Sequence, residues 1–437
     1  MSVTTSADPR EIINQSSMTV LQVIVVAIAI TLNALDGFDL LSISFAAPGI
    51  AEEWGVSRAA LGIVLSMELI GMVVGSVFLG GVADKIGRRP TILGCLVVMT
   101  FGMFMVTTAS SIVEISIWRV LTGLGIGGML AAINAVTAEF SNLKKRHLCI
   151  SLMVIGYPIG GVLGGMMASH LLIEHDWRSI FYFGAGVTAV LIPLFYFLVP
   201  ESVLWLSTKQ PENALEKTNI ILKRMGHQTV DALPVITINK ETEATQSIFS
   251  SGLFKITMLV TLTYFLHVTT FYYILKWVPK IVTDMGFAAS SAGGVLVSAN
   301  VGAMIGGAIF GLLATKFDLR RVMMIFLLFS AAFVALFGQT AADLDQMSLL
   351  AASAGFFTNA GMVGMYALCV EAFPTHARAF GTGFVIGIGR VGAVVSPILA
   401  GFLFSADLGL PMVSVVMGMG SLLAIVALFF LKLNLKK

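Results

Sequence analysis

Two carboxylates lie inside the first long apolar run of the chain, at Asp36 and Asp39. Their spacing places both side chains on one face of a helix. A charge near the centre of a bilayer costs about 3 kcal/mol, so acids at such positions are candidates for function. Two carboxylates in a medium of low dielectric repel each other, which favours proton binding by one of them. The pair is typical of a proton-coupling site, and the alternative is a structural lock that holds the first helix to its neighbours.

Glu68 and Arg119 interrupt two further apolar runs. A guanidinium stays charged, so Arg119 must pair with an acid or bind an anion. Pairing with Asp36, Asp39 or Glu68 would make protonation of that acid depend on breaking the pair, although a static ion pair is the alternative. Glu68 is either a second proton site or a protonated donor that ties helices together. We assign proton coupling to Asp36, Asp39, Glu68 and Arg119.

Arg390 lies in an apolar run near the end of the chain. Its planar fork of donors suits a carboxylate, so it is the candidate for binding an organic acid. Three acids against two arginines leave one net negative charge among these residues, and a substrate carboxylate adds a second. This balance favours the uptake of a proton together with the anion. The residues therefore predict anion–proton symport, with protons as the coupling ion and no other cofactor.

An internal repeat of the two halves pairs Asp36 with His267, and Glu68 with Asn300. Polar residues at matching depths in two repeats predict a shared central cavity. His267 is either a titrating residue in contact with water or a neutral histidine that packs. Tyr272 offers a ring and a hydroxyl, although such aromatic residues more often pack than bind. We predict substrate contacts from Arg390, Asp36, Asp39, His267, Tyr272 and Asn300.

The composition indicates that lipid is the solvent for most of the chain. Of 437 residues, 57% are hydrophobic and only 11% are charged, whereas soluble domains carry about 25% charged residues. A net charge of +2 is too small to indicate nucleic acid as a partner. The three cysteines lack metal-ligand spacing, and we predict no metal site. No nucleophile–base set or phosphate loop is present, so an enzyme is not expected, and the polar residues 1–18 do not resemble a cleavable signal peptide.

Twelve apolar runs are long enough to span a bilayer. We expect an all-α membrane protein with twelve transmembrane helices in two six-helix repeats. The halves comprise residues 1–199 and 255–437, and the polar residues 200–254 form a cytoplasmic loop between them. The expected spans are 20–47, 59–80, 91–108, 112–138, 148–171, 179–199, 255–278, 289–314, 321–338, 347–370, 381–404 and 411–431.

The basic residues predict the orientation of these spans. With the N-terminus inside, twenty of the 26 Lys and Arg residues fall on the cytoplasmic side, and only Arg58, Arg178, Lys276 and Lys280 fall on the outer side. Such an asymmetry favours cytoplasmic termini. We expect a multi-pass monomer in the cell membrane, which is the inner membrane in a Gram-negative bacterium, in contact with lipid, protons and a small organic acid.

The segment Gly80-x-x-x-Asp84-Lys85-x-Gly87-Arg88-Arg89 resembles the loop signature of the major facilitator superfamily. Arg119-x-x-x-Gly123-x-Gly125-x-Gly127 is similar to the fourth-helix motif of that superfamily. The resemblance covers nearly the whole chain and implies alternating access, with a cytoplasmic switch that latches the halves in the outward-open state. Asp84 would pair there with a basic group such as Arg146. The expected switch residues are Gly80, Asp84, Lys85, Gly87, Arg88, Arg89, Glu139, Arg146, Glu371 and Arg378.

Asp36-Gly37-Phe38-Asp39, together with Arg390 and the glycines around it, resembles signatures of the aromatic acid:proton symporters. This resemblance implies import of a benzoate- or hydroxybenzoate-like acid with protons. The run from Pro200 to Leu206 is similar to a sugar-porter motif, except that Val203 and Leu204 depart from it, so sugar transport stays a minor alternative. Three further functions stay open, namely a proton symporter of an aliphatic organic acid or sugar acid, a proton-driven drug exporter and a transport-dead membrane sensor.

Overall fold

The computed structural model describes residues 8–234, 248–250, 253–374 and 377–431. These residues form helices joined by short loops, without a β-strand in the described ranges. Twelve helices in them are long and apolar enough to cross a membrane. The expected all-α architecture with twelve spans is confirmed.

The first half contributes six long helices and a short one before them. Their bounds are α1 Pro9–Gln15, α2 Val20–Trp54, α3 Arg58–Ile86, α4 Arg88–Val106, α5 Ile112–Glu139, α6 Arg146–Glu174 and α7 Arg178–Leu198. The segment between the halves forms α8 Val203–Lys209 and α9 Ala214–Arg224. The second half comprises α11 Phe254–Asp284, α12 Ala289–Ala314, α13 Leu319–Phe337, α14 Leu344–Ala372, α15 Arg378–Gly389, α16 Val391–Ser405 and α17 Leu410–Phe430.

The described helices extend beyond several of the expected spans. The first was expected to end at residue 47, but α2 continues to Trp54. Its last turn carries Glu52 and Glu53, which are exposed, because a helix can continue into water after its apolar stretch has ended. The eleventh span is divided at Arg390, where α15 gives way to α16.

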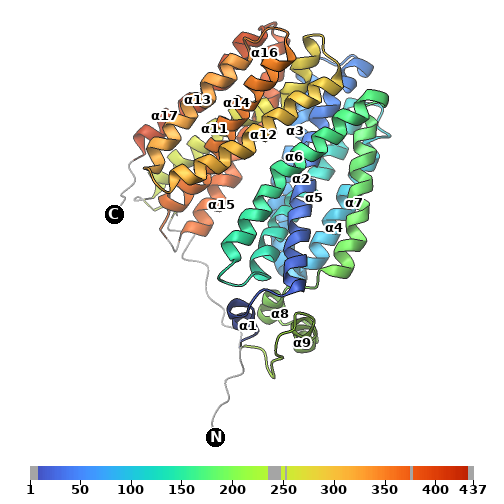
Figure 1. Cartoon of the computed structure of the whole chain (residues 1–437), viewed down its shortest axis with the longest axis vertical. Helices are drawn as coiled ribbons and strands as arrows, with labels where there is room; N and C mark the ends of the chain where they lie inside the picture. The colour runs from blue at the N-terminus through green and yellow to red at the C-terminus, as the bar shows by residue number, and fades with distance from the viewer. Residues whose placement is uncertain (1–7, 235–247, 251–252, 375–376, 432–437) are drawn as a thin grey trace.

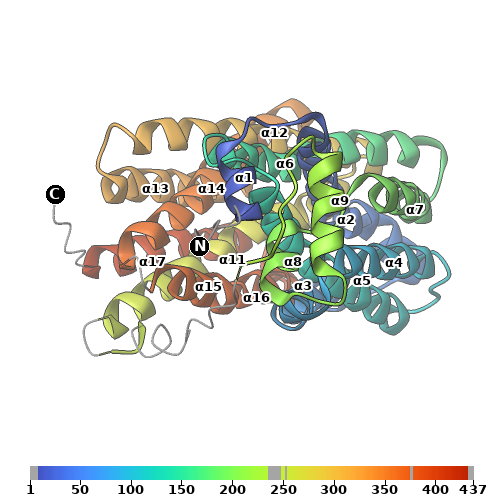
Figure 2. The same cartoon turned by 90° about the horizontal axis from the view of Figure 1, so that it is seen from below.

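The two halves lie side by side as separate bundles (Figure 1). We call the end that carries α1, α8 and α9 the terminal end, and the opposite end the distal end. In Figure 1 the two sets of helices meet near the distal end and diverge toward the terminal end. Seen from below in Figure 2, α8 and α9 lie across the terminal end of the first half.

Polar contacts join the halves at the distal end. The Ser66 hydroxyl donates to the Val394 carbonyl at 2.8 Å, and the Ala59 amide donates to the Ser405 hydroxyl at 2.9 Å. Arg58 forms an ion pair with Asp284 at 3.1 Å. These contacts connect α3 with α16 and α11, so the structure is closed between the halves at its distal end.

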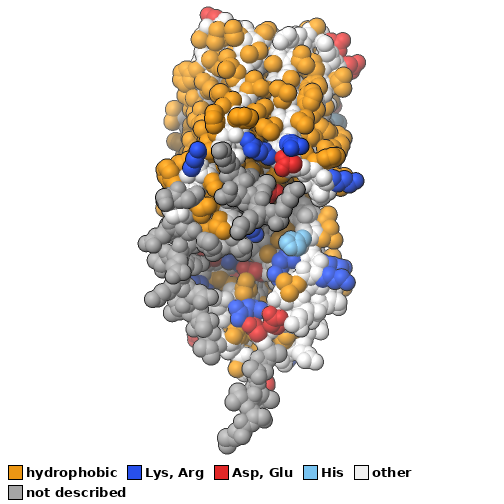
Figure 3. Space-filling model, turned by 90° about the vertical axis from the view of Figure 1, so that its left-hand side faces the viewer, with side chains coloured by type: hydrophobic (Ala, Val, Ile, Leu, Met, Phe, Trp, Pro, Cys, Tyr) orange, Lys and Arg blue, Asp and Glu red, His pale blue; other side chains and the backbone are white. Residues whose placement is uncertain are grey.

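The outer surface of the bundle suits a bilayer. Apolar side chains cover the upper part of the face in Figure 3, and most of the charged side chains in that view lie below them. Exposed residues on this surface include large apolar ones such as Leu328, Phe329 and Leu422. Apolar surface of this extent requires lipid rather than water as its neighbour.

Candidate functional site

A cluster of ionisable side chains is buried in the first half. Asp36 and Asp39 on α2, Glu68 on α3 and Arg119 on α5 are at most 1% exposed. We call these four residues the buried acid cluster. Arg119 pairs with Glu68 and also donates to the backbone carbonyl of Asp39 at 2.9 Å. Of the acids that the sequence offered as partners of Arg119, the structure therefore selects Glu68.

Glycines allow the helices of this cluster to approach closely. A Cβ at Gly123 of α5 would collide with the backbone carbonyl of Glu68, and one at Gly37 of α2 would collide with the carbonyl of Tyr157 on α6. Backbones that approach this closely require small residues at the contact. Gly123 thus explains how α3 and α5 bring Glu68 and Arg119 into contact.

Asp36 and Asp39 differ from Glu68 because neither aspartate forms an ion pair within the described part of the chain, whereas Glu68 pairs with Arg119. Within the described part of the chain, no hydrogen-bond donor reaches the carboxylate oxygens of either residue. Both carboxylates are repelled electrostatically by Glu68, and Asp36 is also repelled by Asp39. A buried carboxylate without a partner binds a proton more readily than one that is paired. The arrangement therefore suits proton binding at the two aspartates.

Lys276 adds a cation to this cluster from the second half. The expectation that Lys276 lies on the outer side of the membrane is wrong, since its side chain is fully buried within α11. Its ammonium donates to the backbone carbonyl of Leu40 and lies 3.8 Å from the Glu68 carboxylate. Its apolar neighbours Leu275, Trp277 and Val278 are the sequence signal that indicates a position inside a span, and the prediction did not use it.

A second polar group surrounds Arg390 at the junction of α15 and α16. Tyr264 and Tyr272 on α11 and Tyr366 on α14 lie close enough to interact electrostatically with its guanidinium. The rings of Tyr264 and Tyr366 have centroids 6.3 Å apart. We call Arg390 and these three tyrosines the arginine–tyrosine site. Tyr366 is 42% exposed, so this site is accessible from outside the packed core.

Tyr157 on α6 interacts with residues of both polar groups. It is within electrostatic range of Asp36 and Glu68 on one side, and of Tyr272 and Arg390 on the other. Tyr272 was predicted from the sequence, whereas Tyr157 and Tyr366 were not, because tyrosines in apolar helices usually pack. The sequence signal for Tyr157 is its place beside Pro158, which the internal repeat aligns with Arg390.

The polar contacts of His267 and Asn300 are made with residues outside the arginine–tyrosine site. His267 is fully buried in the second half, and its ring nitrogens contact the Ser421 hydroxyl and the Thr358 carbonyl, each at 2.9 Å. Asn300 donates to Leu296 at 2.9 Å, and its side-chain oxygen faces Gly161 across the boundary between α12 and α6. His267 therefore packs within one half, whereas Asn300 lies at the contact between the halves.

The predicted switch residues gather at the terminal end. Arg88 pairs with Asp84 at 2.6 Å and with Glu139 at 3.4 Å. The suggested pairing of Asp84 with Arg146 does not occur. Arg146 instead donates to Asn14 at 2.6 Å and to the Ala138 carbonyl at 3.0 Å. Because Arg146 is bonded to Asn14 and to the end of α5, Asp84 pairs instead with Arg88.

The other predicted switch residues vary in their surroundings. Lys85 and Glu371 are exposed, and Gly80 and Arg378 are partly buried. Glu371 lies within electrostatic range of Asp318, which caps the first turn of α13 by accepting from the Arg321 amide at 3.1 Å. These residues mark the terminal ends of α3, α14 and α15.

Glu201 holds the beginning of α4 in place. Its carboxylate accepts from the backbone amides of Arg88 at 3.0 Å and Arg89 at 3.2 Å, as a helix N-terminus favours. Gly87 precedes these amides with φ = 112°, and a Cβ there would collide with the same carboxylate. Burial raises the pKa of Glu201 above its usual range, although the backbone amides act in the opposite direction.

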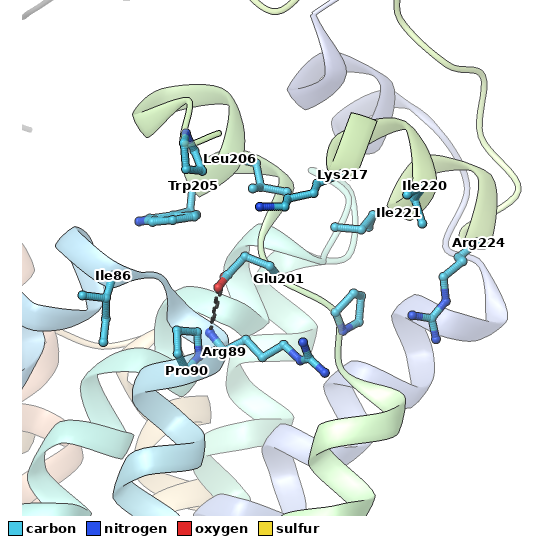
Figure 4. Close-up of a pocket in the computed structure, with 12 residues that line it drawn as sticks. Ile86, Arg89, Pro90, Glu201, Trp205, Leu206, Lys217, Ile220, Ile221 and Arg224 are labelled. Atoms are coloured by element: carbon cyan, nitrogen blue, oxygen red, sulfur yellow. Dashed lines mark hydrogen bonds between the residues drawn. The ribbon is translucent and has the colours of Figure 1, made fainter. Parts of the chain in front are cut away.

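A surface cavity of about 510 Å³ lies beside this contact. Figure 4 shows Arg89 bonded to Glu201 at its wall, with Lys217 and Arg224 contributed by α9. Trp205 also lines it and donates from its indole to the Asp84 backbone carbonyl at 3.0 Å. The helices α8 and α9 are thus attached to the first half where α3 ends and α4 begins, which is where several of the predicted switch residues lie.

Comparisons with known proteins agree with this architecture. The chain matches the family model of the Major Facilitator Superfamily over residues 27–309 and 260–437. It is 26% identical to the gallate transporter of Pseudomonas putida, over 96% of this chain and 94% of that protein. It is 29% identical to the 4-hydroxybenzoate transporter of Acinetobacter baylyi, over 89% of this chain and 86% of that protein.

A solved structure shares the fold. The crystal structure of a D-xylose-proton symporter superposes with a TM-score of 0.74 at 17% sequence identity, covering 95% of this chain and 99% of that one. The chain also carries the loop signature, which runs from the end of α3 into α4, and the glycine row of α5. With a family match that runs from residue 27 to residue 437, this multi-pass membrane protein belongs to the Major Facilitator Superfamily and is a transporter rather than an enzyme.

Proposed function

We propose that this protein imports an aromatic carboxylate together with one or more protons, by alternating access between its two halves. The substrate carboxylate binds Arg390, and Asp36 or Asp39 carries a proton. The observation that carries the proposal is a pair of polar groups, one that holds aspartates without a partner in the described part of the chain and one that holds a half-buried arginine. Tyr157 interacts with residues of both groups.

The surroundings of the two aspartates support proton coupling. The buried acid cluster and Lys276 together hold three acids and two bases, so one negative charge is left over when all are ionised. A proton on Asp36 or Asp39 removes that charge, and both carboxylates are without a donor in the described part of the chain. Uptake of the proton therefore needs no ion pair to break.

The surroundings of Arg390 support an aromatic acid. A guanidinium can bind a carboxylate through two parallel hydrogen bonds, and tyrosine rings can pack against an aromatic ring at their faces or edges. Tyr264, Tyr272 and Tyr366 supply both rings and hydroxyls around this arginine. The names of the relatives point the same way, since they are transporters of gallate and 4-hydroxybenzoate.

The closed distal end supports a direction for the cycle. If the terminal end is cytoplasmic, as the basic residues predict, the structure represents a state closed to the outside, in which the halves are apart on the cytoplasmic side. Arg88, Asp84 and Glu139 would exchange their pairs within the first half for contacts with the second half when the carrier opens outward. Gly80, Lys85, Arg89, Arg146, Glu371 and Arg378 belong to the same proposed switch.

The proposal is tested by uptake into proteoliposomes. The labelled substrates are benzoate, 4-hydroxybenzoate, a hydroxycinnamate, an aliphatic dicarboxylate and a sugar acid, each with and without an inward proton gradient. We expect gradient-driven uptake of ring acids, and its loss in Asp36→Asn. Uptake of non-aromatic acids alone would contradict the aromatic substrate, and uptake that ignores the gradient would contradict proton coupling.

A matched pair of variants tests the role of Arg390. Arg390→Lys keeps the charge but loses the planar fork, and we expect KM for the acid to rise about tenfold or more because a charge-assisted hydrogen bond is lost. Arg58→Lys changes an arginine of the same chain that pairs with Asp284 at the distal end. It should leave KM within about twofold, since a partly exposed ion pair contributes little.

A further inference from the structure

We propose that Lys276 is a counter-charge for the buried acid cluster, and that its position depends on whether the distal end is open or closed. Its ammonium enters the buried acid cluster when the halves close at the distal end, and withdraws from the cluster when they open there. Closure at this end would thereby favour release of the coupling proton. The inference rests on the proposed function in one respect, namely that Asp36 or Asp39 carries that proton.

The contacts of Lys276 cross the boundary between the halves. The residue belongs to α11 of the second half, whereas both of its polar contacts belong to the first half. It donates to the Leu40 carbonyl of α2, and its ammonium lies 3.8 Å from the Glu68 carboxylate of α3. Its side chain is fully buried. The Glu68–Arg119 pair, by contrast, lies within one half and need not change when the halves move as rigid bodies.

Two further contacts between the halves must break when the distal end opens. The Arg58–Asp284 pair and the Ser66–Val394 hydrogen bond join the same two halves on the same side of the molecule. Asp284 follows Lys276 by two turns of α11. A movement that separates Arg58 from Asp284 therefore also draws Lys276 away from Leu40 and Glu68.

Withdrawal of Lys276 changes the charge of the cluster. The ionisable groups that face Lys276 are Glu68 from α3 and Arg119 from α5. Asp36 and Asp39 from α2 belong to the same cluster because both interact with Glu68. On its own helix, Lys280 and Asp284 pair with each other. With Lys276 present the ionised cluster has one net negative charge, and without it two. The cluster therefore binds a proton more tightly when the distal end is open.

Thermodynamic linkage relates proton binding by the cluster to opening of the distal end. If opening tightens proton binding, then proton binding favours opening by the same factor. A proton taken up from the distal side would be repelled when Lys276 returns, at the moment when the halves are apart at the terminal end. Lys276 thus acts as a positioning residue for the coupling proton and needs no contact with substrate.

The test measures opening of the distal end without any substrate. Spin labels at Glu174→Cys on α6 and Ala288→Cys before α12 report the distance between the halves, because both positions are exposed at this end. The native cysteines are buried and so are shielded from the labelling reagent. Distances are recorded in proteoliposomes between about pH 5 and pH 8. We expect acid to favour the open form, by a factor in the range of about 5–150 that is typical of coupled sites.

Three variants separate charge from packing. Lys276→Gln removes the charge but retains a donor for the Leu40 carbonyl, and Lys276→Met removes both. Each should flatten the pH dependence of opening to less than about twofold, since the charge that links proton and gate is gone. Lys276→Arg keeps the charge and should keep the pH dependence. The Gln variant carries the test if methionine at this buried position prevents membrane insertion.

Arg58→Met is the matched control, because it removes another cation between the same halves but does not face the cluster. It should shift the open fraction equally at every pH and leave the dependence on pH intact. The proposal is overturned if the open fraction of the wild type does not depend on pH, or if Lys276→Gln keeps the pH dependence as Arg58→Met does. Since no substrate is present, absence of acid uptake by the wild type would contradict the proposed function and leave this result standing.

Discussion

At the scale of single residues, the hydroxyl of Tyr157 connects the two polar groups of the site. It interacts with Tyr272 on one side and lies within range of Asp36 on the other. A substrate bound to Arg390 and a proton bound to Asp36 would therefore both alter the surroundings of one side chain. Tyr157 is therefore placed so that substrate binding at Arg390 can affect proton binding at Asp36, and the reverse.

Tyr157→Phe should raise KM for the acid about three- to tenfold, because one neutral hydrogen bond is lost near the carboxylate site. The control is Tyr273→Phe. Tyr273 is the next residue to Tyr272, but its hydroxyl bonds with Ser414 at 2.7 Å inside the second half. Uptake kinetics in proteoliposomes measure both variants. Equal KM values for Tyr157→Phe and wild type would contradict a role for this hydroxyl.

Glu201→Ala should lower the stability of the protein by about 1 kcal/mol, since the amides at the start of α4 lose the side chain that caps them. Glu201→Gln keeps an acceptor oxygen and should lose less. Thermal unfolding in detergent compares the variants with wild type. Because burial raises the pKa of Glu201, its ionised form is disfavoured in the fold. Its contribution to stability therefore declines as the pH rises through that pKa, and this decline should be absent in Glu201→Gln.

At the scale of elements, the contact between α3 and α16 forms the closed distal end. Gly62 lies against the carbonyl of Pro397, and the Cα of Gly401 would be 3.2 Å from a Cβ placed at Gly62. The two backbones can approach this closely because neither glycine has a side chain. Closure at this end therefore depends on the size of residue 62.

Gly62→Val should prevent complete closure and shift the molecule toward the state that is open at the distal end. The same spin-label pair on α6 and before α12 should report longer distances, and net uptake should fall. Gly94→Val on α4 is the matched control, because no atom lies within 4 Å of a Cβ at Gly94. Distances unchanged by Gly62→Val would show that this contact does not control closure.

The positions of the helices were largely predictable from sequence, whereas their side-chain partners were not. Apolar length alone identifies a span, and the twelve runs appear as twelve helices. Lys276 was misplaced because a lysine near the end of an apolar run normally belongs to the membrane surface. Which acid pairs with Arg119 depends on how α3 packs on α5, and that depends on close contacts such as Gly123 with Glu68, which spacing along one helix does not reveal.

At the scale of the whole molecule, the two ends differ in how the halves are joined. The distal end is closed by contacts between the halves, and at the terminal end Asp84 and Arg88 are paired within the first half. The sequence predicted the two repeats and their loop motif, but not which end is closed. Both arrangements use the same residues, so sequence patterns do not distinguish them.

The predicted orientation can be checked by thiol labelling in intact cells. Glu174→Cys lies at the distal end and Glu216→Cys on α9 at the terminal end, and both positions are exposed. A membrane-impermeant reagent should label the first and not the second, because the distribution of basic residues predicts that the terminal end is cytoplasmic. Both should react after the membrane is permeabilised. Labelling of Glu216→Cys in intact cells would contradict the predicted orientation and show that the terminal end faces outward.

The helix α11 contributes to both polar groups, and this constrains how the protein can change. Tyr272 and Lys276 are four residues apart, which is about one helical turn or 6 Å along the axis. A substitution at Tyr272 that tilts or rotates α11 to admit a different acid also displaces the ammonium that contacts Glu68. Under the proposed function, a change of substrate selectivity through Tyr272 would therefore also change proton coupling. Efforts to retarget this carrier should begin at Tyr366, which lies on a different helix.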